Sequence, residues 1–174
     1  MNMGMGRSLV FKLVRRWIAW QYPQVRWVTT VELAKWRKNP ARIQPLLLDA
    51  RTVVEYEVSH LETAQWIDPA TPDSTALSQI NKNKPVVVYC SIGYRSAKVA
   101  AQLQQVGFTQ VYNLEGSIFQ WANEARPLFQ AEQPTTKVHP YNTQWGLLLK
   151  PEYRAECQEG SSPTSPDSSP TSPN

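Results

Sequence analysis

A cysteine, an arginine and a serine stand close together in the segment C-S-I-G-Y-R-S, which runs from Cys90 to Ser96. The cysteine ends an apolar run that predicts a buried strand, and a helical pattern begins at the other end, so the segment is a short loop that must curl around its own centre. In such a loop successive backbone N–H groups, from about residue 91 to residue 96, can point inward, and the helix N-terminus adds partial positive charge. The segment is therefore predicted to cradle an anion.

The chemistry that this cradle favours is nucleophilic attack by sulfur. The inward N–H groups and Arg95 stabilise the thiolate of Cys90 and lower the pKa of the thiol. Gly93 allows a positive φ, and Ser96 is predicted to cap the helix with its hydroxyl facing the bound sulfur. We take Cys90 as the catalytic residue and expect the substrate to be bound by the rest of the loop, which is Ser91, Ile92, Gly93, Tyr94, Arg95 and Ser96.

These residues also have plainer interpretations. A cysteine after a strand is more often a small buried hydrophobic residue than a nucleophile, and Arg95 could be a solvated charge. The glycine, arginine and serine at these offsets from Cys90, followed by a helix, favour the nucleophile.

The elements that must position the loop alternate between strand and helix patterns from about residue 25 to residue 130. The predicted strands are residues 46–49 (LLLD), 64–67, 85–90 (PVVVYC) and 110–113. The predicted helices are residues 31–38 after a Thr29/Glu32 capping box, 53–58, 73–82 with Asp73 as N-cap, a helix through Val99 to Val106, and 117–124. This alternation predicts the α/β class with a parallel sheet.

The loop C-S-I-G-Y-R-S resembles the C-x-x-G-x-R-S active-site loop of single-domain rhodaneses. Other segments agree in order and spacing. The family's D-x-R followed by E-Y is similar to LLLDAR with Glu55-Tyr56. Its G-H-I-x-G-A resembles Ser59-His60-Leu61 with Ala64. Its G-F to G-G-x-x-x-W ending resembles Val106 to Phe108 with Leu114 to Ser117 and Trp121. The resemblance covers about residues 25 to 130, but glycine is absent at residues 59, 63 and 117.

The resemblance implies a rhodanese-like five-stranded parallel sheet flanked by helices, and an activity. By analogy, Cys90 takes a sulfane sulfur from thiosulfate or a persulfide and passes it to a thiol or to cyanide through a Cys90 persulfide. The expected partners are this small sulfur anion or persulfide donor and the thiol acceptor, with no nucleic acid. Neither a metal nor an organic cofactor is implied.

Two other functions stay open. A phosphatase or arsenate reductase on the same fold resembles C-x5-R, whereas four residues separate Cys90 from Arg95, and the smaller loop suits a single sulfur better than a phosphate. A non-catalytic binding module would use the same scaffold without turnover, which the intact cysteine loop argues against.

Several polar residues outside the loop are not expected to take part in the chemistry. Asp49 and Arg51 follow another strand and are at least as well suited to holding loops together as to contacting substrate. His60 is expected to be a hydrogen-bonded structural residue, and neither it nor His139 has a partner at zinc-ligand spacing. Cys157 stands in a polar segment and is expected to be an exposed bystander.

The chain divides into four segments. Residues 1–24 are a basic amphipathic extension, for which packing on the domain is the favoured role and peripheral membrane contact the alternative. Residues 25–130 form the rhodanese-like domain, residues 131–158 a C-terminal extension, and residues 159–174 a Ser/Pro-rich tail expected to be disordered.

Composition sets the remaining limits. The net charge of +4 comes largely from the first 26 residues, which contain no acid. No run of about 18 apolar residues predicts a membrane-spanning helix. The two cysteines lie in very different contexts, which disfavours a structural disulfide and favours a reducing compartment, so we expect a cytoplasmic protein.

Overall fold

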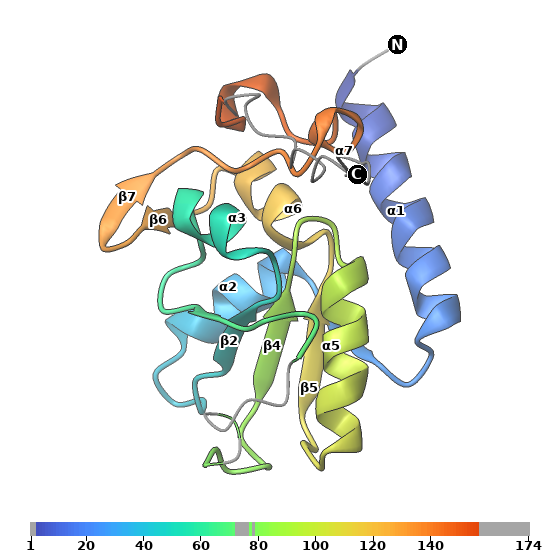
Figure 1. Ribbon diagram of the computed structural model, residues 1–174, viewed down its shortest axis with the longest axis vertical. Coiled ribbons are helices and arrows are strands. Elements are labelled where there is room, and N and C mark those ends of the chain that lie inside the picture. The colour runs from blue at the N-terminus through green and yellow to red at the C-terminus, as the bar shows by residue number, and fades with distance from the viewer. Residues whose placement is uncertain (1–2, 72–76, 78, 157–174) are drawn as a thin grey trace, which may run out of the picture.

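The computed structural model describes residues 3–71, 77 and 79–156 (Figure 1). Cys157, the tail from residue 159 and the N-cap Asp73 predicted from the sequence lie outside the described residues. The helix predicted to run from Asp73 toward Lys82 does not extend that far, because residues 79–84 form turns and bends.

A five-stranded parallel sheet forms the centre of the molecule, in the order β1-β5-β4-β2-β3. Its strands are β1 (Arg26–Val28), β2 (Leu46–Asp49), β3 (Gln65–Trp66), β4 (Val86–Tyr89) and β5 (Val111–Leu114). The helices between them are α2 (Thr30–Lys38), α3 (Val53–Val58), α5 (Tyr94–Gln105) and α6 (Ser117–Asn123). The predicted α/β class and five-stranded sheet are confirmed.

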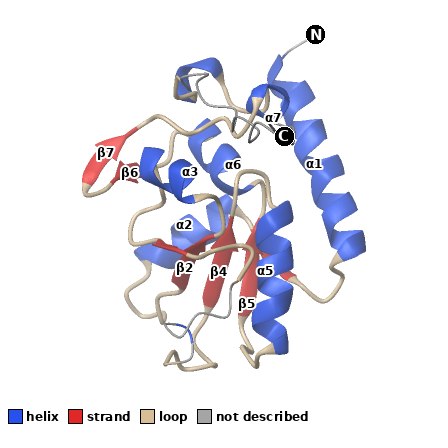
Figure 2. Ribbon diagram, viewed as in Figure 1, coloured by secondary structure: helices blue, strands red, loops and turns tan. Residues whose placement is uncertain are grey.

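The side chains of β4 divide the core into two layers, because successive residues of a strand point to opposite faces. Val86 and Val88 belong to the cluster that includes Val99 and Leu103 of α5. Val87 and Tyr89 belong to the opposite cluster, to which α2 and α6 contribute. The helices therefore cover both faces of the sheet (Figure 2), as a buried parallel sheet requires.

Two helices begin with capping boxes. At α2 the hydroxyl of Thr29 accepts the N–H of Glu32, and the Glu32 carboxylate accepts the N–H of Thr29, as predicted. At α3 Thr52 and Glu55 make the same reciprocal pair. This second box fixes the place of Glu55, whose carboxylate also reaches the cysteine loop.

Helix α1 and the described part of the C-terminal extension pack on this core. Helix α1 (Met3–Gln21) runs beside α5 (Figure 1), and its Ile18 is fully buried. Strands β6 (Leu128–Gln130) and β7 (Gln133–Thr135) form an antiparallel pair. They are followed by α7 (Thr143–Gly146) and a 3-10 turn (Pro151–Tyr153). Between α7 and this turn, Leu148 and Leu149 are buried. The described helices include none that is long and apolar enough to span a membrane. Contact of α1 with a membrane surface stays a prediction.

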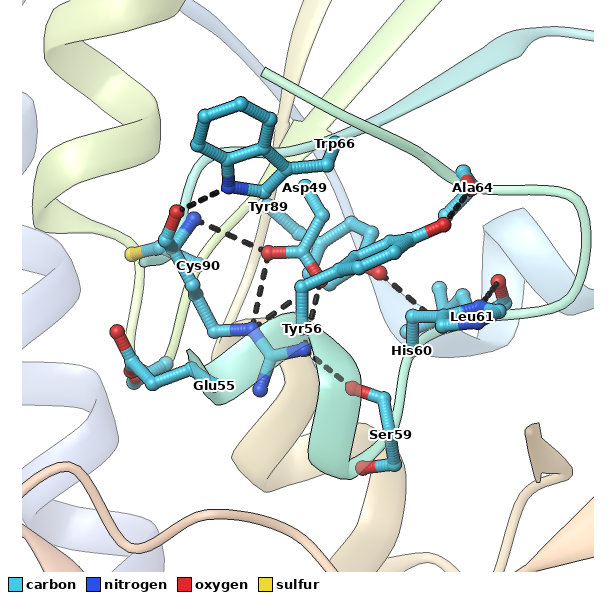
Figure 3. Close-up of polar contacts among 12 residues, drawn as sticks. Asp49, Glu55, Tyr56, Ser59, His60, Leu61, Ala64, Trp66, Tyr89 and Cys90 are labelled. Carbon is cyan, nitrogen blue, oxygen red and sulfur yellow. Dashed lines mark hydrogen bonds and ion pairs between the residues drawn. The ribbon is translucent and has the colours of Figure 1, made fainter. Parts of the chain in front are cut away.

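A buried ion pair lies at the end of β2. Arg51 is fully buried and donates to both carboxylate oxygens of Asp49, at 2.9 Å from Nε and 2.7 Å from Nη2, and it also donates to the carbonyl of Ser59. Trp66 Nε1 donates to the carbonyl of Arg51 at 2.8 Å, and Tyr89 accepts the N–H of Leu61 (Figure 3). Asp49 and Arg51 thus hold loops together.

Replacing Arg51 by methionine leaves the Asp49 carboxylate buried without its partner. We expect the free energy of unfolding, measured by urea denaturation, to fall by about 3–5 kcal/mol. The double variant Asp49→Leu/Arg51→Met removes both charges and should lose less than the single variant. An equal or larger loss in the double variant would contradict this account of the pair.

Candidate active site

Cys90 lies directly after β4, with 1% of its surface exposed. Its Sγ accepts the N–H of Gly93 at 3.1 Å and lies 3.4 Å from the hydroxyl of Ser96. The carbonyl of Cys90 accepts the N–H of Ile118 at 3.1 Å, and that of Ser91 accepts the N–H of Phe119 at 3.2 Å. The loop is therefore closed around the sulfur and held to α6 through its backbone.

The helix after the loop starts earlier than the sequence predicted. Gly93 is the N-cap of α5, with the positive φ of 115° that its residue type allows, and it makes no side-chain cap. Ser96 is thus not the cap but lies in the first turn, fully buried. From there its hydroxyl faces Cys90, as expected, and donates to Asn113 Oδ1 at 2.7 Å.

Asn113 and Ser117 are among the site residues that the sequence analysis missed. Asn113 of β5 accepts from Ser96 and donates to the carbonyl of Gly93 at 2.8 Å, which ties the helix start to the sheet. Ser117 accepts the N–H of Cys90 at 3.2 Å from a left-handed backbone with a φ of 50°. The one available signal for Asn113 was a polar residue within the strand sequence VYNL.

Arg95 does not point its guanidinium at the sulfur but is bound by a carboxylate. Its Nη1 and Nη2 donate to the two oxygens of Glu55 at 2.7 and 2.8 Å, and Nη2 also donates to Ser91 Oγ at 2.9 Å. Ser91 donates in turn to Glu55 Oε1 at 2.9 Å. The capping box and the family-like E-Y pair were the sequence signals for Glu55, which was not predicted to join the site.

The charges around the loop shift two pKa values. Burial raises the pKa of the Cys90 thiol, but the charge of Arg95 and hydrogen bonds from Ser96 and Gly93 outweigh it, so the pKa lies below its usual value. Burial also acts to raise the pKa of Glu55, but hydrogen bonds and charge from Arg95, with the Thr52 N–H, lower it to about 2. Glu55 is therefore a carboxylate at neutral pH, and the Cys90 thiolate forms more readily than that of an unperturbed cysteine.

A cavity of about 160 Å³ opens onto Cys90, and we refer to it as the Cys90 pocket. It is lined by Cys90, Ser91, Ile92, Tyr94 and Arg95 of the loop, Val14 and Trp17 of α1, and Tyr141 and Trp145 near the C-terminal end. The predicted Gly93 and Ser96 do not line it but support the sulfur from the loop and the first turn of α5. Helix α1 and the C-terminal extension therefore both contribute to the site.

The structure offers no metal centre within the described part of the chain, where no group of three potential ligands gathers. His60 is buried, with Nδ1 3.0 Å from the carbonyl of Leu61, and its ring stacks on Tyr56 at 4.4 Å. It is a hydrogen-bonded structural residue, as expected.

Replacing Arg95 by methionine should raise the pKa of Cys90, because Arg95 is the nearby charge that favours the thiolate. The rate of alkylation by iodoacetamide as a function of pH reports the midpoint of thiolate formation. In the double variant Glu55→Gln/Arg95→Met no unpaired carboxylate remains, and its midpoint should lie between those of wild type and the single variant. A midpoint for Arg95→Met at or below that of wild type would contradict the assignment.

The depressed pKa of Glu55 also predicts an acid dependence of stability. A carboxyl group whose pKa falls from 4.5 to about 2 on folding stabilises the protein fully above pH 4.5, and that contribution is lost as the pH drops toward 2. It amounts to roughly 3 kcal/mol. Unfolding free energies measured between these pH values should decline less steeply for Glu55→Gln than for wild type, and equal slopes would count against the predicted shift.

Comparison with known proteins gives relatives at the level of sequence. The family model for the rhodanese-like domain matches residues 29–124. The tRNA uridine(34) hydroxylase of Escherichia coli K12 is 31% identical over 123 residues, which are 68% of this chain and 35% of that protein. The chain thus spans about a third of the length of the curated relatives it matches.

Solved structures give relatives at the level of fold. A rhodanese-like domain protein from Staphylococcus aureus is 31% identical with a TM-score of 0.50, over 56% of this chain and 91% of that one. A rhodanese-related protein from Thermoplasma volcanium is 23% identical, with a TM-score of 0.52, over 60% and 98% of the two chains. A Rhodopseudomonas palustris protein, described as a possible tyrosine phosphatase, is 22% identical, with a TM-score of 0.56, over 64% and 90%. The last two share the fold of this chain.

The family model matches more than half of the chain, and Cys90 lies in the loop that resembles the family's active-site loop. The chain therefore belongs to the rhodanese-like domain family.

Proposed function

We propose that the protein is a sulfurtransferase that carries a sulfane sulfur on Cys90. The observation that supports this most directly is the environment of Sγ, which accepts a backbone N–H from Gly93, faces the hydroxyl of Ser96 and opens onto a pocket. These groups favour a thiolate, which is the nucleophilic form of cysteine. The family supplies the same expectation for this loop.

The proposed reaction has two displacements at sulfur. The Cys90 thiolate attacks the outer sulfur of the donor, forming an S–S bond while the donor's own bond to that sulfur breaks, and the leaving group departs with the electron pair as sulfite or a thiolate. The terminal sulfur of the persulfide is then attacked by the acceptor, and Cys90 leaves again as the thiolate. The cycle is redox neutral. N–H groups of the loop and of the first turn of α5 stabilise its anionic forms.

Phosphoryl chemistry on this fold is the first alternative. A phosphatase loop uses its arginine to bind the oxygens of a phosphate, and here both Nη atoms of Arg95 are engaged by Glu55. The loop also has four residues between cysteine and arginine rather than the five of C-x5-R. These features favour sulfur over phosphate as the bound group. The non-catalytic binding module is disfavoured by the same polarised thiol.

A second candidate comes from the relatives named for hydroxylation of tRNA uridine 34, which are 31% identical to this chain. On that alternative the protein would act on a uridine of tRNA. The chain matches 35% of those relatives, so their whole activity need not reside in this segment.

The replacement Cys90→Ser should abolish sulfur loading and lower turnover by on the order of 1,000-fold or more, because no other nucleophile replaces the thiolate. The measurement is the intact mass after incubation with thiosulfate or with glutathione persulfide, followed by release of the bound sulfur to cyanide. Cys157→Ser is the matched control, and its transfer rate should stay near that of wild type.

An adduct of one sulfur atom that depends on Cys90 supports the proposal. Absence of an adduct from every donor would overturn it. The same preparations are assayed for hydrolysis of aryl phosphates and for hydroxylated uridine in tRNA, so that either alternative is detected directly.

A further inference from the structure

Beyond the loop that surrounds Cys90, the pocket has walls from helix α1 and from the C-terminal extension. Val14 and Trp17 from α1, with Tyr141 and Trp145 from the C-terminal extension, wall the Cys90 pocket from outside residues 29–124, which match the family model. These walls therefore lie outside the segment that the family model matches, whereas the loop residues of the pocket lie inside it.

Helix α1 is fixed at the pocket by several contacts. The ring of Trp17 stacks on that of Tyr94 at a centroid distance of 5.1 Å, and the Tyr22 ring meets Tyr94 edge-on at 6.2 Å. On the neighbouring turn, Arg15 pairs with Glu115 at 2.8 Å. Together with the buried Ile18, these contacts hold an aromatic side chain beside the nucleophile.

The opposite wall is held by the C-terminal extension. The Arg95 guanidinium lies over the ring of Tyr141, 4.8 Å from its centroid. The Tyr141 backbone has a φ of 66°, a left-handed conformation that costs a non-glycine residue roughly 1–2 kcal/mol. Asn142 caps α7 by accepting the N–H of Trp145 at 2.9 Å. Because strained backbone conformations are often found at functional sites, this strain suggests that the position of the Tyr141 ring is important for the pocket.

The pocket offers little to a highly charged substrate. Among the described residues that line it, Arg95 carries the one formal positive charge, and its guanidinium is already paired with Glu55. An inorganic dianion such as thiosulfate would lose hydration against aromatic rings without gaining a free cation. An anion with one charge fewer and an apolar body would lose less and cover the walls.

The volume of the pocket fits a six-membered ring. It measures about 160 Å³, close to the roughly 150 Å³ of an apolar protein cavity that binds benzene. We propose that the Cys90 pocket selects organic sulfur donors that carry an apolar group of about this size, in preference to inorganic thiosulfate. This inference rests on the proposed sulfurtransferase function and names its substrate class.

Three sulfur donors distinguish the effect of the donor's charge from the effect of its aromatic ring. Thiosulfate is a dianion without a ring, methanethiosulfonate a monoanion without a ring, and benzenethiosulfonate a monoanion with one. The rate constant for loading sulfur onto Cys90 is measured by intact mass and divided, for each donor, by its rate with free mercaptoethanol. We expect the normalised rates to rise in this order, with at least about a tenfold gain from the ring.

Two tryptophans of α1 give a matched pair of variants. Trp17→Ala removes a pocket wall and should abolish most of the gain from the ring. Trp20→Ala removes the same side chain from a position that is 79% exposed and outside the pocket, and it should keep the gain. Alkylation of Cys90 by N-phenyl iodoacetamide relative to iodoacetamide should show the same pattern without depending on sulfur transfer.

The outcomes are distinct. A ring preference that is present in wild type and Trp20→Ala but lost in Trp17→Ala supports the inference. Equal normalised rates for all three donors in wild type would overturn it and leave the proposed function standing. If no donor loads Cys90, the proposed function and this inference fall together. A ring preference that survives in Trp17→Ala, with α1 still folded by circular dichroism, would overturn the role given to this wall.

Discussion

The pairing of Glu55 with Arg95 is the interaction on which the rest of the site depends. Glu55 sits in the first turn of α3, where it accepts the N–H of Thr52, and it is 2% exposed. A carboxylate buried to this extent requires a cation and hydrogen bonds, and Arg95 and Ser91 supply both. Arg95 follows Cys90 by a few residues, so its ion pair with Glu55 holds the cysteine loop against α3.

The pair also decides the electrostatics of the sulfur. The charges of Glu55 and Arg95 nearly cancel at a distance, so the pair does not attract anions to the pocket in general. Arg95 is nevertheless close enough to Sγ for its charge to lower the pKa of Cys90. Stabilisation of the thiolate therefore comes from the charge of Arg95 together with short-range groups of Ser96 and Gly93. Such groups act on the atom they touch, which suits an intermediate in which charge moves by the length of one S–S bond.

Local patterns predicted the elements, and contacts between distant segments determined the details. The strands at 46–49 and 85–90 and the helices at 31–38 and 53–58 follow from apolar runs and capping boxes, which are properties of neighbouring residues. The cap assigned to Ser96 was wrong because the positive φ of Gly93 starts α5 three residues earlier. Asn113, Ser117 and the aromatic walls come from other parts of the chain, and no local spacing brings them to Cys90. Thr63 and Ser117, which stand where the family pattern has glycine, adopt left-handed φ values of 63° and 50°, a region that glycine enters more easily.

The separation between the nucleophile loop and the walls of its pocket has a consequence for how such proteins diverge. The groups that contact Sγ belong to the segment shared with the family, whereas Trp17, Tyr141 and Trp145 lie before and after it. Substitutions, grafts or recombination at the two termini can therefore alter which molecules are admitted while the reacting group keeps its surroundings. On the proposed function, selectivity can therefore change by mutation or by design while the segment that holds the thiol stays the same.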